Sequence, residues 1–163
     1  VFFFFFNTFK FNTDVNKSKC YRIMNSILSK CRNKPELVIP LCDAYCFPVL
    51  LYGSEVMMLN NSQKSSLDST VKHLFYKLFN SNDAHVIKQC QYYMSCLPTS
   101  YVIDLRSARF YDKLKNSENV LLRSFFEKFG SNFLFDLSVK YCLFNCRASI
   151  FKVRMWAHFI DSL

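Results

Sequence analysis

Apolar residues recur at helical spacing along most of the chain. Between residues 15 and 33 they share one arc of about 140° on a helical wheel, and they are Cys20, Ile23, Met24, Ile27, Leu28 and Cys31. Asp14 precedes this run, where a carboxylate can accept hydrogen bonds from the unpaired N–H groups of a first turn. The pattern therefore predicts an amphipathic helix over residues 15–33 with Asp14 as its N-cap.

The next segment, residues 36–52, is almost continuously apolar but contains Pro40 and Pro48. Each proline lacks the N–H that a helix interior needs, so a helix here should be kinked or divided near these positions. Residues 50–53 alone also suit a short buried strand, and periodicity leaves that alternative open, although we expect helix. Because the segment is short and is interrupted by Asp43 and the prolines, no membrane insertion is expected.

A further helix is predicted to begin near residue 60, because Asn60 and Gln63 have the spacing of a capping box. Its apolar positions again share one face, and they are Leu67, Val71, Leu74, Phe75, Leu78 and Phe79. Helices are also expected over about 86–96, 98–115, 119–129 and 133–161. Polar residues should form loops at 80–83 and 116–118, and Gly130 suits the position just after a helix end.

Composition narrows the fold class. Apolar residues make up 51% of the chain, which is enough for a hydrophobic core, and only two of the 163 residues are glycine. Sandwiches and barrels of β-strands need many tight turns, for which glycine is the usual residue. We therefore expect a mainly α fold, an irregular bundle of about six to seven helices. The Phe-rich N-terminal segment, residues 1–13, is also compatible with a strand.

The chain is basic, with 21 Lys and Arg against 12 Asp and Glu and a formal net charge of +9. Such a surface attracts polyanions, of which nucleic acid is the commonest inside cells. The densest group of cations lies between residues 17 and 34, where the sequence has no acidic residue. The group consists of Lys17, Lys19, Arg22, Lys30, Arg32 and Lys34. These side chains could neutralise phosphates, and a merely solvated helix face would give the same pattern.

Two weaker signals for nucleic acid lie downstream. A second basic set is diluted by Asp104 and Asp112, and it consists of Arg106, Arg109, Lys113 and Lys115. Tyr92 and Tyr93 could stack on bases, but aromatic residues this abundant belong mostly to a core. Neither signal predicts an interface by itself.

The residues disfavour several kinds of chemistry. Gly53 and Gly130, the two glycines, form no phosphate-binding loop, and no D-D or D-x-D pair is present to hold two metal ions. The pairs Cys42/Cys46 and Cys142/Cys146 have the i, i+4 spacing of one helix face, and with His158 the second pair would supply three zinc ligands. Most cysteines have apolar neighbours, however, so reduced core thiols are favoured, and with them an intracellular location, nuclear or cytoplasmic.

Residues 46–55 carry the most specific pattern, CFPVLLYGSE. It resembles the C-L-P-x-L-L-Y-G-x-E signature that follows the catalytic palm in LINE-type (non-LTR) retrotransposon reverse transcriptases, with Phe47 in place of the usual Leu. The segment from Asp14 to Lys17, the stretch NSIL at 25–28 and the stretch FYKLF at 75–79 are similar to what surrounds that signature. The resemblance covers about residues 12–115.

This resemblance implies the thumb-side region of an RNA-directed DNA polymerase, whose helices would hold an RNA–DNA or DNA duplex. The Tyr-x-Asp-Asp motif, which binds Mg²⁺ in the palm of such enzymes, does not occur in these residues. We therefore expect no catalysis and no cofactor in this chain, with the palm and an endonuclease domain as partners in a longer parent chain. The implied division is a Phe-rich segment or palm remnant at 1–13, a thumb-like region at 14–115 and a helical extension at 116–163.

Other functions remain open. A helical protein-interaction domain would use the apolar excess to contact a partner, and its cations would only be solvated. A zinc-stabilised module would need metal in the purified protein. A decayed copy of a mobile element would have no selected function.

Overall fold

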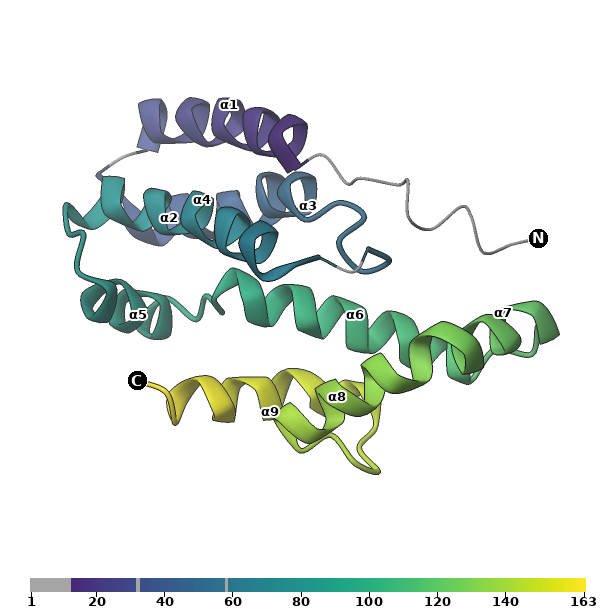
Figure 1. Ribbon diagram of the computed structural model, residues 1–163. Coiled ribbons are helices and arrows are strands. Elements are labelled where there is room, and N and C mark those ends of the chain that lie inside the picture. The colour runs from purple at the N-terminus through teal and green to yellow at the C-terminus, as the bar shows by residue number, and fades with distance from the viewer. Residues whose placement is uncertain (1–12, 32, 58) are drawn as a thin grey trace. The chain divides into compact units, whose positions relative to one another are not determined.

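The computed structural model, shown in Figure 1, describes residues 13–31, 33–57 and 59–163. The chain divides into two compact units, the first ending at Tyr52 and the second running from Gly53 to Leu163. The expectation of a strand or palm remnant at 1–13 falls almost entirely outside the described residues.

The described residues are mainly helical and contain no strand, which confirms the expected fold class. The first unit contains α1 (Thr13–Cys31), α2 (Pro35–Tyr45) and α3 (Phe47–Leu50). The second unit contains α4 (Asn61–Phe79), α5 (Ala84–Tyr93), α6 (Thr99–Lys115), α7 (Val120–Phe125), the π-helical turn η2 (Phe126–Gly130), α8 (Ser131–Tyr141) and α9 (Ala148–Ile160).

The amphipathic pattern of α1 sets the core of the first unit. Cys20, Met24 and Leu28 are buried, and α1 packs against both α2 and α3. Burial of a side chain such as Met24 contributes about 2 kcal/mol. Asp14 is not the N-cap, because the helix begins one residue earlier, at Thr13. It lies in the first turn, where its charge still complements the helix dipole, and it forms an ion pair of 2.7 Å with Lys17.

Proline divides the segment 36–52 as expected. Pro40 lies inside α2, and the helix ends at Tyr45, before Pro48 in the first turn of α3. The two helices meet at Cys46, whose backbone is helical with φ −88° and ψ −49°. Residues 50–53 are therefore no strand. Leu50 ends α3, and Gly53 follows at φ 77°, a left-handed conformation that favours glycine.

In the second unit, α4 begins with the predicted capping box. Asn60 Oδ1 accepts a hydrogen bond of 2.8 Å from the Gln63 N–H, and Gln63 Oε1 accepts one of 3.0 Å from the Asn60 N–H. The apolar face of α4 is buried at Leu67, Val71, Leu74 and Phe75. The polar loop at 80–83 is also confirmed, because Asn80 closes the helix in a left-handed conformation.

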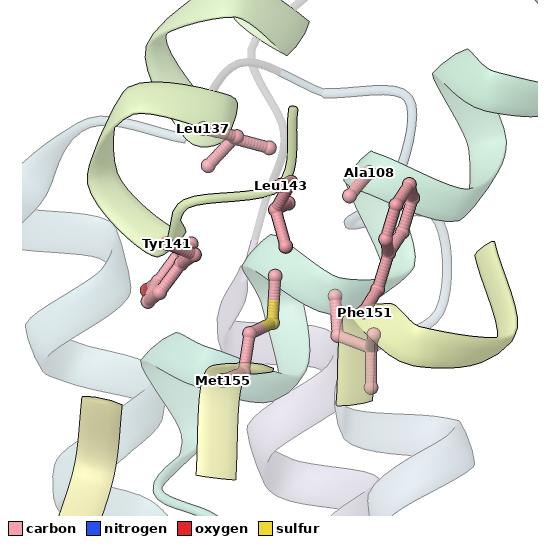
Figure 2. Close-up of a cluster of buried hydrophobic side chains, with 7 residues drawn as sticks. Ala108, Leu137, Tyr141, Leu143, Phe151 and Met155 are labelled. Carbon is pink, nitrogen blue, oxygen red and sulfur yellow. The ribbon is translucent and has the colours of Figure 1, made fainter. Parts of the chain in front are cut away.

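The long helix α6 is the centre of the second unit, since it packs against α4, α7, α8 and α9. Figure 1 shows α9 running alongside α6. Figure 2 shows the apolar cluster between these elements, into which Ala108, Leu137, Tyr141, Leu143, Phe151 and Met155 project. A second cluster joins Tyr111, Leu114 and Phe126 at the other end of α6.

The expected helix end at Gly130 is wrong. Gly130 has φ −101° and ψ −24°, and α7, η2 and α8 follow one another without a break. A Cβ at this position would lie 2.5 Å from Cδ1 of Tyr111, so the glycine permits close packing of η2 on α6. The single helix expected over about 133–161 is also wrong, because the chain turns after α8, where Cys142 and Asn145 have positive φ, and α9 begins only at Ala148.

The functional division at 115/116 follows from the extent of the resemblance, and it stays a prediction. Compactness places a boundary elsewhere, between Tyr52 and Gly53. The helices on both sides of residue 116 pack together, since α6 contacts α7, α8 and α9. The described residues contain seven helical segments, within the expected six to seven, when α2 and α3 are counted as one divided helix and α7, η2 and α8 as one continuous helix.

Candidate functional site

The candidate site begins with the exposed face of α1. Lys19, Arg22 and Lys30 are exposed, and they lie within about 80° of one another around the helix axis, opposite the buried Met24. Within the part of the chain that the structure describes, none of the three forms an ion pair. This face therefore presents three cations whose charge is not neutralised by a carboxylate of the described residues.

The other three cations of this set have different surroundings. Lys17 is only half-exposed, and its ammonium is paired with Asp14 at 2.7 Å. Lys34 is exposed in the turn between α1 and α2, where it precedes the first residue of α2. Arg32 lies outside the described residues. Of the predicted group, Lys19, Arg22 and Lys30 thus form one cationic face on α1. Lys34 lies beyond the end of this helix, and the charge of Lys17 is paired with Asp14.

The segment that resembles the reverse-transcriptase signature contains both anchors and exposed groups. Leu50 and Leu51 are buried, and the Tyr52 side chain is 76% exposed. The Tyr52 carbonyl accepts a weak hydrogen bond of 3.4 Å from Asn16 Nδ2, which connects the first turns of α1 to the end of this segment. Burial explains why Leu50 and Leu51 are apolar, and the positive φ of residue 53 explains why it is glycine.

Three buried cysteines meet in the core of the first unit, namely Cys20, Cys42 and Cys46. The thiols of Cys20 and Cys42 both hydrogen-bond to Cys46, which lowers the pKa of Cys46 against the opposing effect of burial. The hydrogen bond to Cys46, together with burial, raises the pKa of Cys20. Cys42 and Cys46 thus act as core thiols, and they join α1 to α2 and α3.

The other cysteine pair does not share a helix face. Cys142 is exposed with φ 53° just after α8, and Cys146 lies in the loop before α9. The Cys146 thiol donates to the Cys142 carbonyl at 3.9 Å, and His158 Nδ1 lies 3.0 Å from the Tyr101 hydroxyl. The described residues contain no cluster of three or more His, Cys, Asp or Glu side chains placed to hold a metal ion.

The second unit contains a buried charge that no local sequence pattern predicts. Asp104 on α6 is 1% exposed, and its carboxylate binds groups from three other positions in the unit. Lys64 of α4 lies 3.1 Å from Oδ1, while Lys140 and the Tyr141 hydroxyl of α8 lie 2.8 and 2.7 Å from Oδ2. The carboxylate therefore connects α4, α6 and α8.

Electrostatics keeps Asp104 ionised. Burial favours the neutral acid, but hydrogen bonds from Lys140 and Tyr141 and the charges of Lys64 and Lys140 outweigh it, so the pKa of Asp104 is lowered. The pKa of Tyr141 is raised by its burial and by the Asp104 charge. Because Asp104 faces inward, it does not dilute the second basic set, whose Arg109 is exposed on the same helix.

The tyrosine pair on α5 also differs from its expected place in the core. Tyr92 is 40% exposed and Tyr93 is 79% exposed, with their ring centroids 5.5 Å apart. These aromatic rings and the Asp104 network could not be located from periodicity, since their neighbours come from distant parts of the sequence. The only sequence signal was the adjacency of the two tyrosines.

Comparison of the chain with protein-family models, curated proteins and solved structures gives no match. In the described part of the chain, no helix combines the length and apolar character that a membrane span requires.

Proposed function

We propose that this chain is a thumb-side fragment of a LINE-type reverse transcriptase, which helps to hold the template–primer duplex and performs no catalysis by itself. The observation that carries the proposal is the cationic face of α1, where Lys19, Arg22 and Lys30 are exposed and form no ion pair with any described residue. In the chain it precedes the segment at 46–55 that resembles the signature of that family. The Mg²⁺ of such a polymerase would belong to the palm.

The physical basis of the proposal is the rigidity of this face. Lys19 and Lys30 are eleven positions apart in one helix, so their Cα atoms are separated by about 16 Å along its axis. The opposite side of α1 is anchored by Cys20, Met24 and Leu28, which restricts rotation of the helix. Cations held on a fixed line can follow a phosphate backbone, and their binding would release counterions from the duplex.

Replacement of Lys19, Arg22 and Lys30 together by Gln tests this function. We expect weaker binding to an RNA–DNA duplex. The negative slope of log affinity against log salt should become shallower by up to about 3, which is about 0.9 for each phosphate that is no longer neutralised. Filter binding over a range of salt concentrations measures both quantities. Gln retains the helix propensity and most of the side-chain length, so helical content should not change.

The matched control carries the same change of charge in the second unit. Lys128, Arg147 and Arg154 are also exposed, and their combined replacement by Gln removes three positive charges from other helices and loops. If the two triple variants bind the duplex equally well, the affinity comes from net charge and the role of α1 is rejected.

A protein-interaction domain is the second candidate. It is favoured by the exposed apolar side chains of α7, where Val120 is 72% exposed and Leu121 is 79% exposed. Exposed apolar groups of this kind mark many protein contacts. Absence of measurable duplex binding by the unaltered chain at low salt would favour this function over the first.

A further inference from the structure

An open pocket of about 520 Å³ lies between the end of α5 and α9 in the second unit. Its lining consists of Tyr92, Tyr93, Ser95, Lys152 and Trp156. The volume is in the range of small-molecule sites, and the lining residues include three aromatic rings and one cation but no carboxylate. The pocket belongs to a different unit from the cations of α1.

The pocket walls are held by neighbouring structure. Lys152 and Trp156 are four residues apart on α9, so they share one helix face. The Trp156 ring lies 5.7 Å, centroid to centroid, from the ring of Phe159, which is fully buried. On the opposite wall, the Ser95 N–H donates to the Tyr92 carbonyl at 3.0 Å and turns the chain directly after α5.

We propose that this pocket binds an unpaired base and its adjoining phosphate in a single-stranded nucleic acid. The rings of Tyr93, which is exposed, and Trp156, which is half-buried, line the pocket, and stacking on aromatic rings is the usual mode of sequence-tolerant binding to single strands. Lys152 is exposed and supplies the charge for a phosphate. A base inside a duplex is already stacked on both sides, so the exposed rings favour a single strand.

Charge also orients the strand. The C-terminal end of α5 carries the partial negative charge of the helix dipole, which repels a phosphate near the tyrosines. Lys152 projects from α9 on the other side of the pocket. The phosphate therefore binds toward Lys152 and the base toward Tyr92 and Tyr93. This inference does not depend on the duplex contact proposed for α1.

The sole tryptophan of the chain, Trp156, reports directly on this pocket. Oligonucleotides of about eight nucleotides suit a single-strand site, and deoxyuridine and uridine forms, which carry the same base and differ only in the sugar, are each titrated against the full chain. We expect quenching of Trp156 fluorescence, and weaker quenching with an abasic oligonucleotide that has the same phosphates. Equal binding of the abasic and the normal oligonucleotide, or no quenching at saturation, would overturn the proposal. A preference for one sugar identifies RNA or DNA as the ligand.

Two substitutions separate stacking from charge. Tyr93→Ala should weaken binding at least about fivefold, the loss expected for one stacked base, while Tyr93→Phe retains the ring and the affinity. Tyr45→Ala, at an exposed tyrosine of the first unit, is the control. Lys152→Gln should make the negative slope of log affinity against log salt shallower by about 0.7, the value for one single-strand phosphate. Lys72→Gln is the control and should leave this slope unchanged, because Lys72 is already paired with Asp68 at 2.8 Å.

These variants also distinguish the pocket from the duplex site. Loss of α1 cations should leave Trp156 quenching by the single strand intact, and Tyr93→Ala should leave duplex affinity intact. If Tyr93→Ala and Tyr45→Ala bind the single strand as well as the unaltered chain does, the pocket is not the binding site.

Discussion

The phenolic hydroxyl of Tyr141 donates a hydrogen bond of 2.7 Å to Oδ2 of Asp104, a carboxylate that is only 1% exposed. The same oxygen accepts from Lys140, and Oδ1 accepts from Lys64. A buried charge is costly unless it is paired and hydrogen-bonded. The paired carboxylate therefore adds a polar connection between α4, α6 and α8 to their apolar packing.

Replacement of Asp104 by Asn should lower the free energy of unfolding by at least about 3 kcal/mol. The amide keeps the shape of the side chain, but its nitrogen cannot accept the two hydrogen bonds that Lys140 and Tyr141 donate to Oδ2. Hydrogen bonds to a charged group are worth about 1.5–3 kcal/mol each. Urea unfolding followed by circular dichroism measures the loss. The control is Asp112→Asn on the same helix, at a half-exposed position that should change stability by less than about 0.5 kcal/mol. Equal losses in the two variants would show that the network is not stabilising.

The stability supplied by Asp104 should depend on pH in a defined direction. Its pKa in the folded chain is below the ordinary value of 3.8, so its contribution is complete above about pH 4 and is lost as the pH falls through the folded pKa. The difference in unfolding free energy between the unaltered chain and Asp104→Asn should therefore narrow in acid. Urea unfolding of both proteins at about pH 6 and about pH 3 tests this. If the difference in unfolding free energy between the two proteins is larger at about pH 3 than at about pH 6, the lowered pKa of Asp104 is contradicted.

Gly130→Ala should destabilise the second unit by about 1–3 kcal/mol, the usual cost of overpacking. In an ordinary helix the same change stabilises by up to about 1 kcal/mol, so the sign is diagnostic. The reason is the aromatic ring of Tyr111, which would lie 2.5 Å from the added Cβ. Thermal and urea unfolding measure the effect.

Two further variants check the cause of the Gly130 effect. Tyr111→Leu removes the ring, so the added cost of Gly130→Ala should be smaller in that background. Ser124→Ala, at an exposed position of α7, should be nearly neutral. A stabilising effect of Gly130→Ala would show that the space beside Tyr111 is larger than it is in the structure.

Asn60→Ala should lower the free energy of unfolding by about 1 kcal/mol, because the first turn of α4 loses the side-chain acceptor of its capping box. Asn61→Ala alters the neighbouring exposed residue inside the helix and should be neutral or slightly stabilising. Urea unfolding of the two variants measures the difference. If both variants have the same stability, the cap does not contribute.

Alkylation should distinguish the cysteines by their surroundings. Cys142 is exposed, whereas Cys20, Cys42 and Cys46 are buried together in the first unit. Brief treatment of the native chain with iodoacetamide should therefore modify Cys142 first, with the buried trio modified only after unfolding in urea. Peptide mass spectrometry before and after unfolding measures each site. Early modification of Cys46 would mean that the core of the first unit opens readily.

Local patterns in the sequence were sufficient to predict a helical chain and several helix ends, but not the break after Tyr141 that divides the helix expected over 133–161 into α8 and α9. The apolar face of α1 and the capping box of α4 depend on residues three or four positions apart, and such residues are neighbours in any helix. The divided helix at 36–52 likewise follows from the geometry of proline. The exposed cations at Lys19, Arg22 and Lys30 follow from the same periodicity, because they lie opposite the buried face.

Only the tertiary structure decided the contacts between distant residues. Asp104 meets Lys64 and Lys140 across 40 and 36 positions of the sequence, and Tyr93 joins Trp156 in one pocket. Gly130 has the sequence context of a helix end, but the ring of Tyr111 on another helix determines why glycine stands there. Helical periodicity describes one helix at a time. The packing of helix on helix, which buries one carboxylate and leaves two tyrosines exposed, is determined by the complementary shapes of side chains far apart in the sequence.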